Sequence, residues 1–174
     1  MKTNIICIVG PSGSGKTYMS QYLKKIAKIP YVVSCTTRPM RVGEKDGVDH
    51  WFVSPADLRI DRQNNDILAY TRYGGYEYWA KHSDIVKFRT VSYVIDEEGL
   101  KMLMDKFSYK YNIISVYVDS PEKMRLNNGV TKERIERDKE RETLPEKAYT
   151  YILHNDGTIE EFNEKIKSII ADGI

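Results

Sequence analysis

The sequence predicts an α/β fold built on a doubly wound parallel sheet. Three short apolar runs, at residues 5–9, 91–95 and 113–118, are rich in β-branched residues, which is typical of parallel strands covered on both faces. Stretches with the spacing of amphipathic helices lie between them, and this alternation favours right-handed crossovers within one open sheet. At 174 residues the chain is long enough for a single domain, 1–174.

Weaker elements complete the alternation. Two further strands are predicted from shorter runs, at 31–34 and 151–153. Apolar residues at helical spacing predict helices at 16–28, 99–107, 132–141 and 159–170. In the first of these helices we expect the side chains of Met19, Leu23 and Ile26 to face the core.

Two stretches break the alternation. Residues 39–80 combine glycine, aromatic and charged residues with short alternating pieces, which predicts a small insertion containing β-strands. Residues 120–142 are highly charged and helical in pattern after a core strand, and we expect them to form a mobile lid. The core then consists of 1–38, 81–119 and 143–174.

The composition is that of an ordinary globular protein, with 41% hydrophobic and 30% charged residues. The net charge is only +2, which argues against a dedicated nucleic-acid-binding protein. No apolar stretch approaches the roughly 20 residues of a membrane span, and the first residues do not resemble a signal peptide. We therefore expect a cytoplasmic protein without a membrane partner.

The two cysteines predict no redox or metal chemistry. Cys7 lies in a strand pattern and Cys35 in a polar loop, and they form neither a CxxC motif nor a disulfide framework. We expect two reduced structural thiols.

The most specific motif is GPSGSGKT, which matches G-x-x-x-x-G-K-[ST] between an apolar strand and an amphipathic helix. Its glycines let backbone N–H groups turn toward phosphate oxygens, and the helix directs the positive end of its dipole at them. Lys16 adds a charge toward the β and γ phosphates, and Thr17 adds a hydroxyl for Mg²⁺. The alternative is a glycine-rich turn without a ligand. The motif predicts a P-loop NTPase-type fold that binds ATP or GTP through Gly10, Pro11, Ser12, Gly13, Ser14, Gly15, Lys16 and Thr17.

A carboxylate ends the strand at 91–95. We predict that Asp96 binds Mg²⁺, directly or through water, and contacts the substrate. The alternative is a helix N-cap or a hydrogen-bonded core acid.

A second anion site is predicted after the weak strand at 31–34. Arg38 and Arg41 flank a Pro-Met pair that stiffens the backbone, so two guanidinium groups can converge on one phosphate monoester. The alternative is two solvated arginines paired with Glu44 and Asp46.

The stretch SCTTRPMRVGEKDGVDHWF, residues 34–52, resembles the acceptor-binding signature of guanylate kinases, the P-loop enzymes that phosphorylate GMP with ATP. The resemblance covers most of the chain. It continues without a gap to Tyr78, includes a glycine three residues after Asp96, and ends in YILHND, which is similar to a Tyr-x-x-x-Asn-Asp segment of the family.

The resemblance implies an acceptor site. Ser34, Arg38, Arg41 and Tyr78 match positions that hold the acceptor nucleotide, chiefly its phosphate. His50 stands where the family usually has a phosphate-binding tyrosine, and a histidine can donate a hydrogen bond whose strength varies with pH.

One further match concerns the donor side, and one position departs from the family. Asn155 matches an asparagine near the adenine pocket of the family, and the alternative is a turn residue. The paired aspartates of the family's Asp-x-Asp are reduced to one, with Val94 at the first position and Asp96 at the second.

The chain departs from the family at base recognition. The guanine-reading glutamate of the family aligns with Ala69, and its hydroxyl residue aligns with Ala80. A site without polar readers loses discrimination between bases. Glu77 and Asp66 are candidate substitutes for the carboxylate, and the alternative is that each is a surface charge.

The predicted lid carries positive charge. Arg134, Arg137 and Arg141 share one face if the segment is helical, and the family has arginines in its lid. Arg137 and Arg134 are the candidate catalytic residues. The alternative is a solvated helix in which these arginines pair with Glu133, Glu136 and Glu140.

Three functions stay open. The first is an ATP-dependent nucleoside monophosphate kinase of guanylate kinase type that uses Mg²⁺, in which Lys16, Arg38 and Arg41 act on the phosphates during in-line transfer. The second is a kinase with a different or relaxed base preference. The third is a non-catalytic module that binds a phosphorylated partner through Arg38 and Arg41; the intact Lys16 argues against it, because a scaffold needs no phosphate-transferring lysine.

Overall fold

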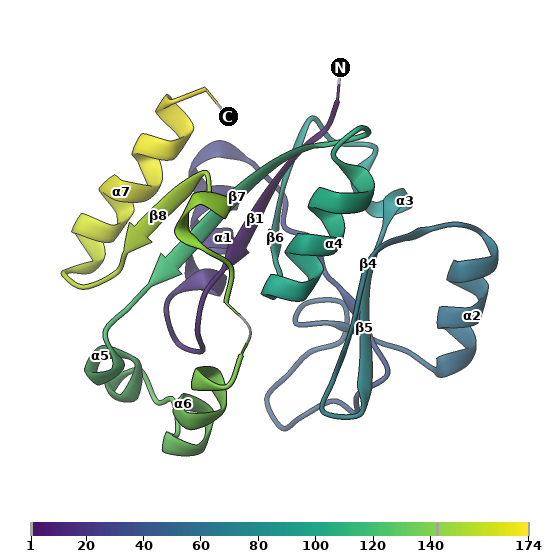
Figure 1. The fold of residues 1–174 in the computed structure, drawn as a ribbon, viewed down its shortest axis with the longest axis horizontal. Helices are drawn as coiled ribbons and strands as arrows, with labels where there is room; N and C mark the ends of the chain where they lie inside the picture. The colour runs from purple at the N-terminus through teal and green to yellow at the C-terminus, as the bar shows by residue number, and fades with distance from the viewer. Residues whose placement is uncertain (1, 142, 174) are drawn as a thin grey trace.

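A four-stranded parallel sheet forms the centre of the structure, a computed structural model that describes residues 2–141 and 143–173. Its strand order is β6-β1-β7-β8 (Figure 1), and every neighbouring pair is parallel. The strands are β1 (Asn4–Val9), β6 (Thr90–Val94), β7 (Asn112–Asp119) and β8 (Tyr151–His154). Met1, Glu142 and Ile174, which fall within the predicted ranges, lie outside the described residues.

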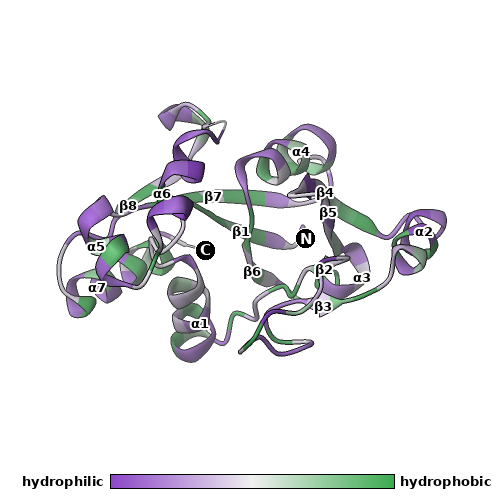
Figure 2. Cartoon of the chain, turned by 90° about the horizontal axis from the view of Figure 1, so that it is seen from below, coloured by the Kyte–Doolittle hydropathy of each residue, from purple (hydrophilic) through white to green (hydrophobic). Residues whose placement is uncertain are grey.

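Helices cover both faces of this sheet, because alternate residues of β1 point to opposite sides. Ile6 and Ile8 pack in one apolar cluster with α1 (Lys16–Ala27) and α7 (Ile159–Ala171). Ile5, Cys7 and Val9 pack in a second cluster with α4 (Glu97–Phe107). Figure 2 shows α1 and α4 on opposite sides of β1 and β7. The predicted doubly wound sheet is therefore confirmed.

A smaller mixed sheet, of order β3-β2-β5-β4, lies beside α4. Its strands are β2 (Cys35–Thr36), β3 (Trp51–Phe52), β4 (Ile67–Tyr73) and β5 (Tyr76–Lys81). Two helices accompany it, α2 (Pro55–Gln63) and α3 (His82–Ile85). Leu58 of α2 packs with Cys35 and Trp79 in a separate small core. The predicted insertion at 39–80 covers most of this sheet.

The predicted lid contains two short helices, α5 (Glu122–Asn127) and α6 (Lys132–Lys139). A 3₁₀ turn, η1 (Glu146–Ala148), leads from this region to β8. In Figure 1 the two helices lie beyond the ends of β7 and β8, on the same side of the molecule as the β4–β5 hairpin. In the chain these two helices lie between β7 and β8.

Several local expectations were wrong. The run at 31–34 forms only a single bridge, Tyr31 to Ser92, beside the edge strand β6. Ile26 is 39% exposed and does not face the core, unlike Met19 and Leu23. The predicted helix at 132–141 ends at Lys139. These differences lie at a sheet edge and at helix ends, where a sequence pattern constrains the backbone least.

Cys35 lies in β2 and not in a polar loop, and its thiol is buried. Cys7 is buried in β1, and both cysteines are free, as expected. Burial raises the pKa of the Cys35 thiol to about 12, so it stays protonated at neutral pH. Within residues 2–141 and 143–173, no helix has the length and apolar character that crossing a membrane requires.

Candidate active site

The predicted phosphate loop connects β1 to α1. Gly10, Gly13 and Gly15 have φ of 146°, 74° and 108°, in the region that favours glycine. A Cβ on Gly10 would lie 2.3 Å from the carbonyl oxygen of Val118, so the loop starts directly against β7. Gly15 is the N-cap of the 12-residue α1, which leaves the first N–H groups of that helix open at the loop. This backbone can bind an anion.

Lys16 folds back over this loop. Its Nζ donates a hydrogen bond to the carbonyl oxygen of Pro11 at 2.7 Å. Burial, and after it the charge of Arg141, lower the pKa of Lys16 to about 8, while the carboxylate of Asp138 opposes the shift. The ammonium group is therefore protonated at neutral pH, close to the range where it begins to lose its proton.

Asn155 braces the loop from the end of β8. Its Nδ2 donates to the carbonyl oxygen of Ser14 at 2.9 Å. A Cβ on Gly15 would lie 2.8 Å from the same Nδ2, so loop and side chain are in close contact. Thr17, one residue into α1 from Lys16, is exposed. It lines a separate cavity together with Ser34 and His50.

The predicted acceptor residues gather on the smaller sheet. The Ser34 hydroxyl and His50 Nδ1 are 2.9 Å apart, and the His50 ring meets the Tyr78 ring edge-on with 5.8 Å between centroids. Burial, and then the charge of Arg38, lower the pKa of His50 below its usual value. His50 is therefore neutral at pH 7 and acts as a hydrogen-bonding group.

Arg38 is buried and fixed in position by Glu44. Its Nη1 and Nη2 donate to the two carboxylate oxygens of Glu44 at 3.0 and 2.8 Å, and Nη1 also donates to the Pro39 carbonyl at 2.8 Å. The hydrogen bonds from Arg38 lower the pKa of Glu44 to about 2. Arg41 is exposed, and only its backbone N–H donates to Glu44, at 2.7 Å. The alternative pairing therefore holds for Arg38, whereas Asp46 accepts from the backbone of β3.

One cavity of about 300 Å³ brings the predicted donor and acceptor residues together. Side chains from the phosphate loop, the smaller sheet, the end of β6 and the lid all reach it. Among the predicted site residues, it is lined by Lys16, Ser34, Arg38, Arg41, His50, Tyr78, Asp96, Arg134 and Arg137.

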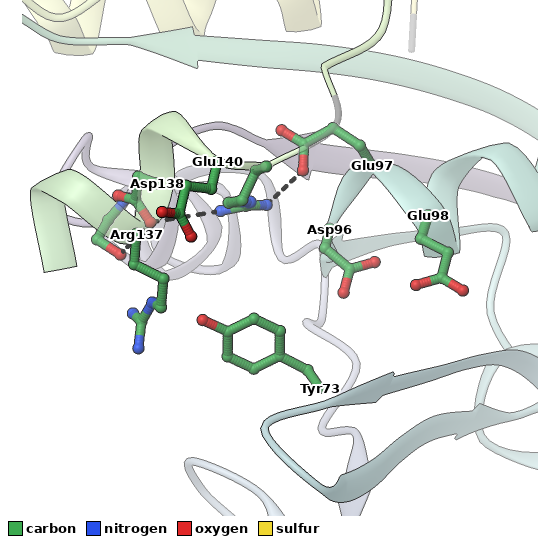
Figure 3. Close-up of a pocket in the computed structure, with 9 residues that line it drawn as sticks. Tyr73, Asp96, Glu97, Glu98, Arg137, Asp138 and Glu140 are labelled. Atoms are coloured by element: carbon green, nitrogen blue, oxygen red, sulfur yellow. Dashed lines mark hydrogen bonds and ion pairs between the residues drawn. The ribbon is translucent and has the colours of Figure 1, made fainter.

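A neighbouring cavity of about 410 Å³ adjoins the first, and both are lined by Tyr73, Asp96, Arg137 and Arg141. Ser12 of the loop and Asp138 of the lid also line the larger one. Figure 3 shows Arg137 and Asp138 on α6 facing Tyr73 and Asp96 across this space. The two cavities thus form one cleft between lid, insertion and core.

The three arginines predicted in the lid make different principal contacts. Nη2 of Arg134 donates to the Ser12 hydroxyl of the phosphate loop at 3.2 Å. The guanidinium of Arg137 lies 5.3 Å from the ring centroid of Tyr73 on the insertion. Arg141 forms an ion pair with Glu97 of α4. Of these three arginines, Arg134 therefore places its charge at the phosphate loop.

The alternative interpretation, in which these arginines pair with Glu133, Glu136 and Glu140, is not borne out in the part of the chain that the structure describes. Glu136 pairs instead with Lys139, at 2.7 Å. Because α6 ends at Lys139, Arg141 does not share a helical face with Arg134. It reaches Glu97 from the segment that follows.

Asp96 caps α4. Its Oδ1 accepts from the backbone N–H of Gly99 at 2.7 Å, which is the N-cap arrangement named above as the alternative to metal binding. Asp96 also lines both cavities and is only partly buried. A carboxylate has a second oxygen, so the cap leaves a group that can face a ligand.

The two positions that align with the family's guanine-reading residues are buried and apolar in the structure. Ala69 and Ala80 are directly paired between β4 and β5 and are 2% and 1% exposed, and Ala69 lines the smaller cavity. Glu77 accepts a hydrogen bond from the Tyr70 hydroxyl at 3.0 Å, and Asp66 accepts hydrogen bonds from the first turn of α3. Neither acid lines either cavity of the cleft.

The sequence analysis missed Tyr73, Arg125 and Asp138. Arg125 is 8% exposed and contacts Asp138, with 3.3 Å between Nη1 and Oδ2. The available signal was spacing, because Asp138 lies four residues after Arg134 and so projects from the same face of a helix. Tyr73 ends β4, and no local pattern distinguishes it from the other tyrosines.

The comparisons with known proteins agree on one family. A family model described as "Guanylate kinase" matches residues 2–173. The guanylate kinase of Thermotoga maritima is 31% identical over 143 residues, covering 79% of this chain and 68% of that protein. That of Mycoplasmopsis pulmonis is 28% identical over 185 residues, covering 97% and 94%. The crystal structure of guanylate kinase from Anaplasma phagocytophilum shares the fold, with a TM-score of 0.67 at 24% identity, covering 98% of this chain and 86% of that one.

Proposed function

Because the chain belongs to the guanylate kinase family, we propose that it transfers the γ-phosphoryl group of ATP to GMP or dGMP. The observation that carries this proposal is the shared cavity. The phosphate-loop lysine and the acceptor arginine pair, Lys16 with Arg38 and Arg41, line one space of about 300 Å³. Phosphoryl transfer requires the two nucleotides in line in one site, and a cavity lined from both sides supports this.

On the donor side, the loop backbone and Lys16 bind the phosphates of ATP. The N–H groups at the start of α1 face the β phosphate, and Lys16 exchanges its hydrogen bond to Pro11 for the phosphate oxygens. Asn155, whose Nδ2 donates to the Ser14 carbonyl, lies beside the loop and would contact the adenine of ATP. These groups neutralise charge on the transferring phosphoryl group.

Thr17 and Asp96 are the residues that would hold Mg²⁺. The exposed hydroxyl of Thr17 and the second carboxylate oxygen of Asp96 are hard oxygen donors, which Mg²⁺ prefers. The described residues hold no cluster of three or more His, Cys, Asp or Glu side chains suited to a metal ion. That fits a cation held mainly by ATP phosphates, which supplies charge neutralisation when bound.

On the acceptor side, Arg38, Arg41, Ser34, His50 and Tyr78 hold the nucleoside monophosphate. Arg38 is oriented in advance by its bidentate bond to Glu44, so little side-chain entropy is lost when it binds. The neutral His50 contributes a hydrogen bond from the ring. The pocket thereby positions an oxygen of the acceptor phosphate to attack the γ-phosphorus of ATP.

The lid, 120–142, completes the site. Arg134 and Arg137 line the cavity from α6 and stabilise the charge on the transferring group. Closure of the lid over the insertion also excludes water, which would otherwise compete as acceptor. The division into core, insertion and lid is therefore also a functional one.

A second candidate keeps the reaction and changes the base. Ala69 and Ala80 offer no polar atom beyond their backbones where the family reads guanine, and neither Glu77 nor Asp66 reaches the cleft. Without polar side chains at these two positions, the wrong base leaves fewer buried polar groups unpaired and is discriminated less. This observation favours a relaxed base preference.

Coupled ADP release with Mg-ATP against GMP, dGMP, AMP, CMP, UMP and dTMP tests the proposal. Turnover with the guanine nucleotides alone supports guanylate kinase activity, and turnover with several acceptors supports the second candidate. Lys16→Ala serves as the inactive control. Absence of turnover with every acceptor would contradict both and would favour a binding module.

A further inference from the structure

A carboxylate from the lid occupies donors of the phosphate loop. The backbone N–H of Ser12 donates to Oδ2 of Asp138 at 2.7 Å, and the Ser12 hydroxyl donates to Oδ1 at 3.2 Å. The two residues are 126 positions apart in sequence. Both oxygens of one carboxylate therefore bind the outer turn of the loop.

Positive charge surrounds this carboxylate. Arg125 Nη1 lies 3.3 Å from Oδ2 and Arg141 Nη1 lies 3.9 Å from Oδ1, while Arg134 donates to the same Ser12 hydroxyl. A polyphosphate needs the same kind of surroundings, namely backbone N–H groups, a hydroxyl and several cations. Asp138 thus presents two anionic oxygens to part of the cluster that would otherwise face phosphate oxygens.

The contact is shielded from water. The Asp138 side chain is 5% exposed and Ser12 is 8% exposed. Charge-assisted hydrogen bonds in such surroundings are stronger and less screened than surface ion pairs. The pairing therefore differs from the exposed pair between Lys139 and Glu136 on the same helix, whose side chains are 55% and 69% exposed.

A second contact holds the lid against the same loop. Val130 precedes α6 and is 6% exposed, and its Cγ2 would lie 2.2 Å from a Cβ on Gly13. Ile135 of α6 is 1% exposed, so the helix is anchored by apolar burial as well as by Asp138. The lid and the phosphate loop are thus packed as one unit.

We propose that Asp138 is an internal competitor for the phosphate loop: it latches the lid to Ser12, and the phosphates of ATP must displace it in order to bind. This inference rests on the proposed function only in that the loop binds ATP. Displacement releases Arg125 and Arg141 from the carboxylate and frees α6 to move. Asp138 thus couples ATP binding to movement of the lid, in addition to the apolar contacts that hold the lid in place.

Direct binding of Mg-ATP to wild type, Asp138→Asn and Glu136→Gln tests the latch. The asparagine keeps the size and one acceptor oxygen, but its hydrogen bonds are neutral and about half as strong. We expect the Kd of Asp138→Asn for Mg-ATP to fall roughly threefold to tenfold. Glu136→Gln removes an equal charge from an exposed position of the same helix and should stay within about twofold of wild type.

Hydrogen exchange of the nucleotide-free proteins provides a second readout. Amides of 130–139 should exchange faster in Asp138→Asn than in wild type, because the latch is weakened, and Glu136→Gln should match wild type. Asp138→Ser, which removes the carboxylate with a smaller side chain, repeats the comparison if the asparagine variant is unstable.

The outcomes are separable. An unchanged or weaker affinity in Asp138→Asn, with wild type binding ATP normally, overturns the latch and leaves the kinase proposal intact. A fall in Kd of similar size in both variants would show that the lost negative charge alone causes the change, and it would also overturn the latch. Failure of wild type to bind ATP at all removes both proposals.

Discussion

Raising the pH from 7 to 9 should weaken ATP binding about tenfold, because Lys16 loses its proton within this range. Its pKa is lowered to about 8, chiefly by burial and then by the charge of Arg141. The lysine binds phosphate only when it is protonated. With that pKa, about nine-tenths of the protein carries the charge at pH 7 and about one-tenth at pH 9.

The sign follows from linkage. Anionic phosphates favour the protonated lysine, so ATP binding raises its pKa and takes up protons wherever the free protein is deprotonated. Affinity therefore falls as pH rises through 8, and it levels off above the pKa of the complex. The tenfold loss corresponds to about 1.4 kcal/mol.

Titration calorimetry with Mg-ATP at pH 7, 8 and 9, at constant ionic strength, measures the Kd and the number of protons taken up on binding. Proton uptake, obtained from buffers of different ionisation enthalpy, should increase across the range. In Arg141→Gln the midpoint should move to higher pH, because a repelling charge is removed from Lys16. In Lys16→Ala the lysine-dependent slope should vanish. A Kd that stays flat from pH 7 to 9 in wild type, or an equal slope in Lys16→Ala, would refute the reasoning.

The remaining predictions concern stability and the acceptor site. Gly10→Ala should destabilise the fold by several kcal/mol, because the new Cβ would lie 2.3 Å from a carbonyl oxygen of β7. The control Gly43→Ala, whose Cβ would have no atom within 4 Å, should cost only its backbone strain of about 1 kcal/mol. Equal losses of stability in thermal unfolding would contradict this prediction. Glu44→Gln should raise the KM for GMP roughly tenfold at unchanged KM for ATP, because Arg38 loses its bidentate partner; steady-state kinetics that show both KM values rising together would count against a positioning role. The same variant should lose part of the acid dependence of stability: the pKa of Glu44 is depressed to about 2, so its contribution is present above the ordinary value of 4.5 and disappears as pH falls toward 2. Phe162→Ala should cost about 3–5 kcal/mol of unfolding free energy in urea titrations, because the ring is 1% exposed in the core, and a loss below about 1 kcal/mol would show that the cluster repacks.

Much of the fold could be predicted because its signals are local. The buried strand β1, the glycines of the loop and the first turn of α1 follow one another without interruption, so pattern, turn chemistry and helix start agree. The strand predicted at 31–34 was wrong for the opposite reason. It lies at the edge of the sheet, where only one neighbour fixes its pairing, and a single bridge to Ser92 is all that forms.

The residues of the candidate site divide in the same way, into those with a local sequence signal and those whose contacts depend on the tertiary fold. Lys16, Arg38 and Arg41 belong to recognisable sequence motifs, and all three line the cavity of about 300 Å³. The ion pairs of the lid did not follow from spacing, because helical neighbours compete with partners that the tertiary fold brings close. Arg141 pairs with Glu97, 44 positions away in the sequence.

By itself the sequence determined the phosphate loop and the alternating core, because each depends on residues within a few positions of one another. The acceptor residues stay a prediction from the family resemblance. Only the tertiary structure decided which charges meet. It brought the donor lysine and the acceptor arginines to one cavity, and it set Asp138 against Ser12 across 126 positions. The physical reason is that electrostatic partners are chosen by distance and burial in space, and the sequence pattern specifies neither for residues on separate elements.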